Sequence, residues 1–178
     1  MDTRELTKMS ICISIICVCS YISFPLPFTP VMVTAQTIAI NLIALILTPK
    51  QSFITILVYI LLGSIGLPIF SGGSAGLEKI VGPTGGFLIG FLIMVPMISY
   101  LKGKTNNFKR YLLVTVFGGM PVLYLIGTIF MCMILRINFI TALGMAVVPF
   151  IFGDILKCFI GSLLAVKLNG VLYKAIEA

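Results

Sequence analysis

Residues 111–135 read YLLVTVFGGMPVLYLIGTIFMCMIL, a run of twenty-five residues without a charged side chain. A helix needs about 20 predominantly apolar residues to cross the hydrocarbon core of a bilayer. A surface helix of a soluble protein would keep charged residues on its water-facing side. The run therefore predicts a transmembrane helix, with a kink at Gly118-Gly119-Met120-Pro121.

The same pattern recurs along the chain. Of its 178 residues, 60% are hydrophobic and 10% are charged, and the mean hydropathy is +1.20, whereas a soluble domain carries about 25% charged residues. Further charge-free intervals separate Lys8 from Lys50, Lys50 from Glu78, and Lys79 from Lys102. The first of these is long enough for two spans. The sequence thus predicts an all-α integral membrane protein, a single domain (1–178) whose six transmembrane helices cover about 9–23, 33–47, 52–67, 83–101, 111–135 and 141–168.

Basic residues are expected to lie mainly on one side of this bundle. If the N-terminus is inside, the outer loops hold only Lys79 and Arg136, and the cytoplasmic side holds Arg4, Lys8, Lys50, Lys102, Lys104, Lys109, Arg110, Lys167 and Lys174. This asymmetry predicts that both termini are cytoplasmic and that the protein crosses the cell membrane an even number of times. Nucleic acid is not an expected partner, because no basic stripe alternates with aromatic residues in a polar domain.

The cysteines do not indicate a metal site. The chain has no histidine and no CxxC pair, and its cysteines all fall inside predicted spans: Cys12, Cys17, Cys19, Cys132 and Cys158. No Cys/His metal centre is therefore expected. The thiols are interpreted as small apolar side chains.

Asp154 and Lys157 are the charged residues that lie deep within a predicted span, just after Pro149. A charge at bilayer depth costs at least ~2.5–3.5 kcal/mol on insertion scales, so such residues face a cavity or a partner. At positions i and i+3 the two side chains share one helical face. Two interpretations stay open: an ion pair that fixes helix packing, or a pair that opens to bind a ligand with N–H donors and a carbonyl or carboxylate.

A second polar group follows the proline-rich segment 25–30, which predicts an extended outer loop. Thr34, Gln36 and Asn41 stand among apolar neighbours, so their side chains need hydrogen-bond partners or water. Bonds between helices and contacts with a ligand explain these residues equally well.

The glycine-rich stretch GPTGGFLIG leads from an outer loop into the fourth span. Backbone N–H groups near Gly82, Thr84 and Gly85, at the start of that helix, can face a ligand anion. Gly86 and Gly90 equally form a small-xxx-small pair for close helix packing. The stretch is not a phosphate loop, because no GK[ST] follows.

Five stretches carry a family likeness. They are PLPFTP (25–30), TAQT (34–37), YILLGSIGLPIF (59–70), GPTGGFLIGF (82–91) and the run from Pro149-Phe150 through Gly153-Asp154 to Lys157. In this order they resemble the BioY family, the biotin-specific substrate-binding subunits (S components) of energy-coupling factor (ECF) transporters. The resemblance spans nearly the whole chain. It departs at Phe87, where the family often has tyrosine.

The resemblance implies a six-helix bundle that binds biotin near the outer side of the membrane. It places Asp154 and Lys157 among the ligand contacts, with the aspartate accepting from the ureido ring and the lysine donating to that ring or to the valerate carboxylate. Tyr59, Phe70 and Phe87 are the expected apolar walls. The outer loops after the first and third spans are the expected lids.

Energy for uptake is expected from other subunits, because the chain has no Walker motif. The resemblance implies a transmembrane coupling subunit and two cytoplasmic ATPases as partners, beside biotin and membrane lipid. ATP is used by those partners, and no cofactor is expected in this chain. Ser10, Ser14 and Cys17 on the first span are the expected docking face, although the Ala-xxx-Ala pattern of many S components is absent.

Three other functions compete with this one. An S component for another vitamin is the nearest, and the GPTGG block argues against it by resemblance. A solitary proton-coupled carrier would use Asp154 as its proton site, and the lack of a second membrane carboxylate argues against that. An intramembrane enzyme with a Ser-His dyad is excluded because the chain has no histidine.

Overall fold

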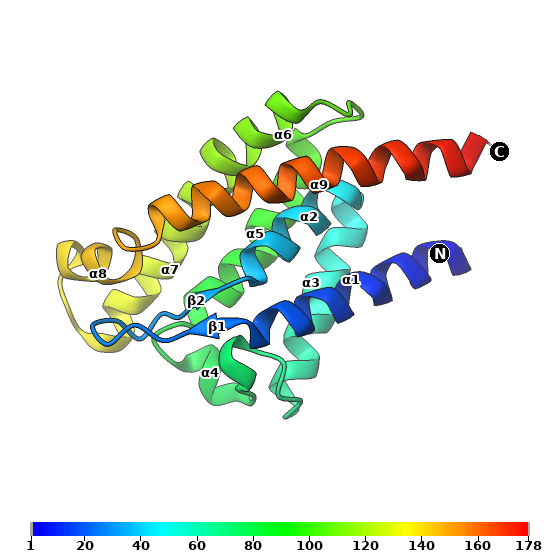
Figure 1. Cartoon of the computed structure of the whole chain (residues 1–178). Helices are drawn as coiled ribbons and strands as arrows, with labels where there is room; N and C mark the ends of the chain where they lie inside the picture. Colours follow the sequence, from blue (N-terminus) through cyan, green and yellow to red (C-terminus); the bar gives the residue numbers. More distant parts are fainter. Residues whose placement is uncertain (1, 178) are drawn as a thin grey trace.

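The computed structural model describes residues 2–177, with side chains through residue 172, and it is a bundle of helices (Figure 1). The predicted all-α class is confirmed. Two short strands pair antiparallel, β1 (Ser23–Phe24) and β2 (Val33–Thr34). The helices are α1 (Thr3–Tyr21), α2 (Gln36–Ile46), α3 (Pro49–Ser64), η1 (Ser71–Gly73), α4 (Leu77–Val81), α5 (Gly85–Leu101), α6 (Phe108–Leu113), η2 (Val114–Gly119), α7 (Met120–Leu135), α8 (Phe139–Ala146) and α9 (Ile151–Glu177).

Helix α2 is the centre of the bundle and contacts α1, α3, α5 and α9. Its residues 39–45 are all buried, as expected for a helix that is apolar on every side. Its eleven residues give a length of ~16 Å, about half the ~30 Å thickness of a bilayer core. The remaining depth beyond Gln36 is therefore left to loops and to a cavity.

The carboxyl end of α2 is capped by side chains from α5 and α9. Lys102 Nζ donates to the carbonyls of Leu45 and Leu47, at 2.6 and 2.9 Å. Each carbonyl has a second donor, since Ser99 donates to Leu47 and Asn169 donates to Leu45. Burial lowers the pKa of Lys102 to about 8, because desolvation disfavours the ammonium form.

The segment between α1 and α2 is extended, as predicted. Ser23 pairs with Thr34 and Phe24 with Val33, and residues 25–32 form a loop at the end of the bundle away from both termini (Figure 1). The predicted second span began at residue 33, whereas the helix begins at residue 36. The difference arises because residues 33 and 34 are held in the ladder of β2.

Helices α6 and α7 join into one run, Phe108–Leu135, which is long and apolar enough to cross a membrane. The π-helical turn η2 interrupts it at the predicted kink. Pro121 lacks the N–H of a regular helical bond, and a π turn absorbs such a shift in the hydrogen-bond register.

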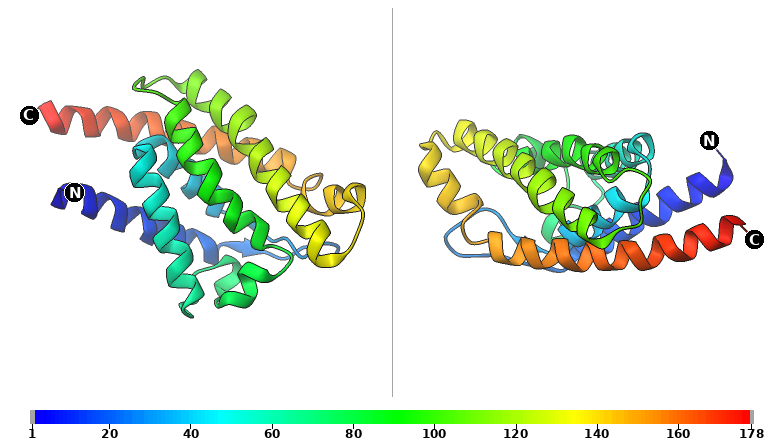
Figure 2. Two further views of the ribbon diagram at one scale, coloured as in Figure 1. Left: turned by 180° about the vertical axis from the view of Figure 1, so that it is seen from behind. Right: turned by 90° about the horizontal axis from the view of Figure 1, so that it is seen from above.

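The predicted sixth span, 141–168, is two helices in the structure, α8 and α9, separated by residues 147–150. Pro149 lies in this break, where a residue without an N–H ends a helix. The break places Asp154 in the first turn of α9. Figure 2 shows that α1 begins and α9 ends at the same end of the bundle, as an even number of crossings requires.

Helices α5 and α7 approach closely through glycine. An added Cβ would meet Phe130 at Gly86 and Leu123 at Gly90. Gly86 and Gly90 thus serve close packing of α5 against α7.

Candidate ligand-binding site

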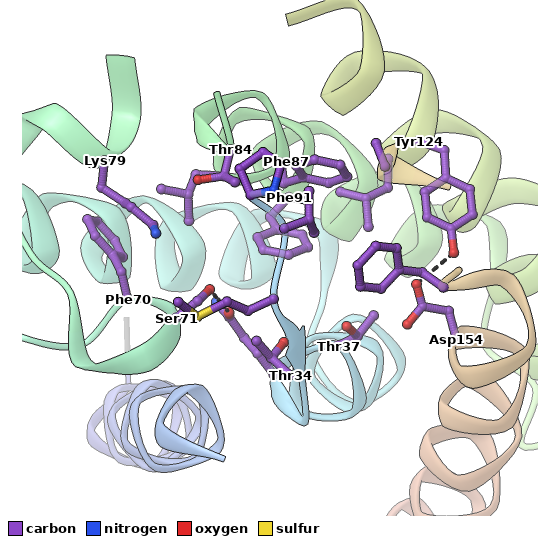
Figure 3. Close-up of a pocket in the computed structure, with 18 of the residues that line it drawn as sticks. Thr34, Thr37, Phe70, Ser71, Lys79, Thr84, Phe87, Phe91, Tyr124 and Asp154 are labelled. Carbon is purple, nitrogen blue, oxygen red and sulfur yellow. Dashed lines mark hydrogen bonds between the residues drawn. The ribbon is translucent and has the colours of Figure 1, made fainter. Parts of the chain in front are cut away.

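A cavity, partly open to solvent, lies beyond the N-terminus of α2 and between α5, α7 and the start of α9 (Figure 3). Small-molecule sites are typically concave and mostly apolar, with a few polar groups that fix the orientation of the ligand. Both loops predicted as lids contribute to it, with Pro30, Val31 and Met32 from one and Phe70 and Ser71 from the other. The remaining lining residues are Thr34, Gln36, Thr37, Lys79, Thr84, Phe87, Leu88, Phe91, Leu123, Tyr124, Ala146, Phe150, Asp154 and Lys157.

Asp154 is the centre of the polar end of this cavity. Lys157 Nζ lies 2.8 Å from its Oδ1, and the Tyr124 hydroxyl donates to its Oδ2 at 2.6 Å. The side chains of Lys157 and Asp154 are 13% and 9% exposed. Because both oxygens are held, the carboxylate has a fixed orientation and keeps lone pairs for further donors. The closed pair therefore presents an acceptor and a donor side by side at the cavity wall.

Two phenylalanine rings of the cavity wall rest on glycines. The Phe70 ring lies against Gly63 of α3, and the Phe87 ring lies against Gly127 of α7. An added Cβ at either glycine would overlap the ring. Glycine at these two positions thus sets how far each ring projects into the cavity.

Gln36 links the cavity to the loop before α4. Its side-chain amide donates to the Tyr59 hydroxyl at 2.9 Å, and the Ser71 hydroxyl donates to its Oε1 at 3.3 Å. Tyr59 in turn donates to the carbonyl of Ile69 at 2.8 Å. Gln36 is 2% exposed and Tyr59 is fully buried. Their polar groups therefore form with protein partners the hydrogen bonds that they would otherwise form with water. The network fixes the loop that carries Phe70.

Seven of the predicted ligand residues reach the cavity: Asp154, Lys157, Gln36, Thr34, Phe70, Thr84 and Phe87. Tyr59 stands behind the wall, where its hydroxyl bonds to Gln36. Asn41 lies deeper on α2, and its amide contacts Cys158 Sγ at 3.4 Å. For Asn41 the structure supports bonding between helices rather than contact with the cavity.

Gly82 and Gly85, predicted to contact the ligand, are not among the residues that line the cavity. An added Cβ would lie 2.8 Å from the carbonyl of Glu78 at Gly82 and would overlap the carbonyl of Ile80 at Gly85. Both glycines therefore allow α4 to fold back against the start of α5, and close backbone approach explains them.

Lys79 and Tyr124 line the cavity and are not among the predicted ligand residues. The sequence marks Lys79 as an outer-loop charge, and no local pattern marks Tyr124 within its apolar run. Their positions follow from how α4 and α7 fold against the bundle. Phe91 has a detectable signal, since it lies four residues after Phe87 and therefore on the same helical face.

A shallow groove on α1 is separate from the cavity and is lined by Ser10, Ile11, Ser14, Ile15, Val18 and Cys19. The hydroxyls of Ser10 and Ser14 donate to carbonyls of their own helix, which leaves the groove mainly apolar. Cys17, predicted as part of the same face, lies outside the groove and packs against the core.

Comparison with known proteins gives concordant results. The BioY family model matches residues 1–174. The chain is 35% identical to the biotin transporter BioY2 of Lactococcus lactis, over 92% of this chain and 89% of that protein. It is also 35% identical to the probable biotin transporter BioY of Pyrococcus horikoshii, over 96% of this chain and 99% of that protein.

A solved structure has the same fold. It is the 2.1 Å crystal structure of the S-component for biotin from an ECF-type ABC transporter, which matches with a TM-score of 0.88 at 25% identity and covers 96% of this chain and 95% of its own. The apolar bundle is thus that of an integral membrane protein. On its sequence and its fold, the chain belongs to the BioY family.

Proposed function

We propose that this protein binds biotin in the cavity and is the substrate-capturing S component of an ECF-type vitamin transporter. The observation that carries the proposal is the Asp154–Lys157 pair at the cavity wall. The ureido group of biotin has two N–H donors beside one carbonyl, so the carboxylate can accept and the ammonium can donate. Hydrogen bonds to charged groups are about twice as strong as neutral ones. Relatives named as biotin transporters support the same ligand.

The apolar remainder of biotin suits the rest of the lining. Its sulfur-containing ring and aliphatic chain would contact Phe70, Phe87, Phe91 and Phe150. Burial of apolar surface contributes roughly 25 cal/mol per Å². Thr34 and Gln36 are proposed as weaker polar contacts near the start of α2.

Active uptake needs partners in this proposal, because the sequence has no Walker motif. We assign this role to a transmembrane coupling subunit and two cytoplasmic ATPases, in line with the ECF-type ABC transporter to which the structural relative belongs. The apolar groove on α1, with Ser10 and Ser14, is the proposed docking face. Small residues there let another helix approach closely.

Calorimetric titration of the detergent-purified chain with biotin tests the binding site. We expect one biotin per wild-type chain and affinity about tenfold to a hundredfold weaker in Asp154→Asn and in Lys157→Ala, since each removes a charge-assisted contact. Glu78→Gln and Lys50→Ala change exposed charges and serve as controls that keep wild-type affinity. Wild-type affinity in both cavity variants would show that Asp154 and Lys157 stabilise helix packing and do not bind the ligand.

Uptake by membrane vesicles tests the transport role and separates it from a solitary proton-coupled carrier. Vesicles that contain the partner subunits should accumulate biotin only when ATP is supplied. Accumulation that follows the proton gradient and ignores ATP would contradict the S-component assignment.

A further inference from the structure

The charged residues of the cavity do not balance one another. Asp154, Lys157 and Lys79 all line it. Asp154 and Lys157 neutralise each other at 2.8 Å. The side chain of Lys79 makes no hydrogen bond or ion pair with any residue that the structure describes. The lining thus carries one positive charge without a counter-charge from the protein.

Lys79 reaches the cavity at the end opposite Asp154. It belongs to α4, the short helix between the glycine-rich loop and α5. Figure 3 shows its amine pointing inward beside Phe70, with Phe87 and Phe91 between it and Asp154. The two charged ends of the cavity are therefore joined by a stretch of lining that is mainly aromatic.

No carboxylate among the side chains of residues 2–172 forms an ion pair with Lys79. The chain has five acidic residues, and Asp154 is the one that lines the cavity. The adjacent Glu78 is exposed and forms no ion pair with Lys79. Helix α4 thus turns its acidic residue to solvent and its basic residue inward.

Partial burial makes this arrangement costly unless an anion is bound. Burial lowers the pKa of the Lys79 ammonium group, because desolvation disfavours its charged form. An ammonium group has three donors and no acceptor. An acidic group of a ligand would satisfy those donors and balance the charge.

We propose that Lys79 binds the carboxylate of the ligand and so fixes its direction in the cavity. This inference rests on the proposed function. The ureido ring then lies at Asp154 and Lys157, and the valerate chain runs past Phe87 toward α4. If Lys157 bound the carboxylate instead, Asp154 would lose its ion-pair partner and keep only the Tyr124 hydroxyl as a donor from the protein, and removing one partner of a buried ion pair is strongly destabilising.

Lys79 is consequently a specificity-determining residue for the free acid. Biotinamide has the same ring and chain but a neutral end, so it would lose the charge-assisted bond to Lys79. Hydrogen bonds to charged groups are worth about a tenfold to hundredfold factor in affinity. We expect the wild-type protein to prefer biotin over biotinamide by a factor in this range.

Calorimetric titration of the purified full chain with both compounds tests the inference. Lys79→Met should weaken biotin binding about tenfold to a hundredfold, leave biotinamide binding unchanged and abolish the preference for the acid. Lys79→Arg, which keeps the charge, should retain the preference. Asp154→Asn should weaken both compounds alike, because it acts on the ring that they share.

The possible results distinguish this inference from the proposed function. Equal affinity of the wild type for the acid and the amide would overturn it without any variant. So would a Lys79→Met protein that binds biotin and still prefers it to biotinamide as the wild type does. A folded wild type that binds neither compound would overturn the proposed function itself, and the inference with it.

Discussion

The hydroxyl of Tyr124 lies 2.6 Å from Oδ2 of Asp154 and joins the second turn of α7 to the first turn of α9. Lys157 holds the other oxygen of the same carboxylate. One bond comes from within α9 and the other from a separate helix. The orientation of Asp154 therefore depends on how α7 and α9 pack.

Tyr124→Phe should weaken biotin binding about tenfold, because the carboxylate loses a donor that fixes its orientation. Calorimetric titration measures the effect. Tyr100→Phe is the matched control, since Tyr100 is 76% exposed and should leave affinity unchanged. Equal affinity of Tyr124→Phe and wild type would show that Lys157 alone positions Asp154.

Gly127→Ala should reduce biotin affinity about fivefold to a hundredfold. The new methyl group would overlap the Phe87 ring and displace it toward the cavity, and overpacking of this kind costs about 1–3 kcal/mol. Gly144→Ala is the control, because an added Cβ there meets nothing within 4 Å. Calorimetric titration of both variants with biotin measures the effect. Unchanged affinity in Gly127→Ala would mean that the Phe87 ring moves away from the cavity and not into it.

Tyr59→Phe should speed biotin dissociation and increase hydrogen exchange in the loop around Phe70. The variant removes the bond to the Ile69 carbonyl and leaves the buried Gln36 amide without its acceptor, at a cost of about 1–3 kcal/mol. Ser64→Ala is the control, because that hydroxyl bonds within its own helix. Exchange at wild-type rates in Tyr59→Phe would show that the loop is held by other contacts.

Lys102 should make stability rise with pH. The pKa of this lysine is about 8 in the folded protein, against an ordinary value of 10.5. Between pH 8 and 10.5 the unfolded chain keeps a proton that the folded protein has lost, so the free energy of unfolding increases across this window. The increase amounts to ~3 kcal/mol.

Denaturation of wild type and Lys102→Met across that pH window gives the free energy of unfolding of each. The difference between the two values measures the contribution of Lys102. Lys102→Met should lack the increase, and the carbonyls of Leu45 and Leu47 keep donors from Asn169 and Ser99. Lys50→Met, at an exposed position, should follow the wild-type curve. Parallel curves for wild type and Lys102→Met would contradict the expectation.

The sequence predicts the helical class of this fold well, because a bilayer leaves few alternatives to a helix for a long apolar run. It also marks several ends, such as Thr48-Pro49, where Thr48 caps α3 and Pro49 begins it. It fails at residues 147–150, where apolar residues continue through a break between two helices. Hydropathy records burial in lipid but does not record where a backbone turns.

The candidate site is predictable only where its residues are neighbours in sequence. Asp154 and Lys157 share a helical face, so their spacing alone brings them together. Tyr124 is thirty residues from Asp154, and α4 carries Lys79 into the cavity through a fold-back against α5. Such contacts depend on tertiary packing, which local patterns do not encode.

The two ends of the cavity are carried by parts of the molecule with different tolerance to mutation. Asp154 and Tyr124 connect two long helices, so a change at either alters the packing of the bundle as well as the site. Lys79 lies on a five-residue helix that packs mainly against α3 and α5. In the proposed binding mode, recognition of the tail of the ligand can therefore change in evolution with less effect on the packing of α7 and α9 than recognition of its ring.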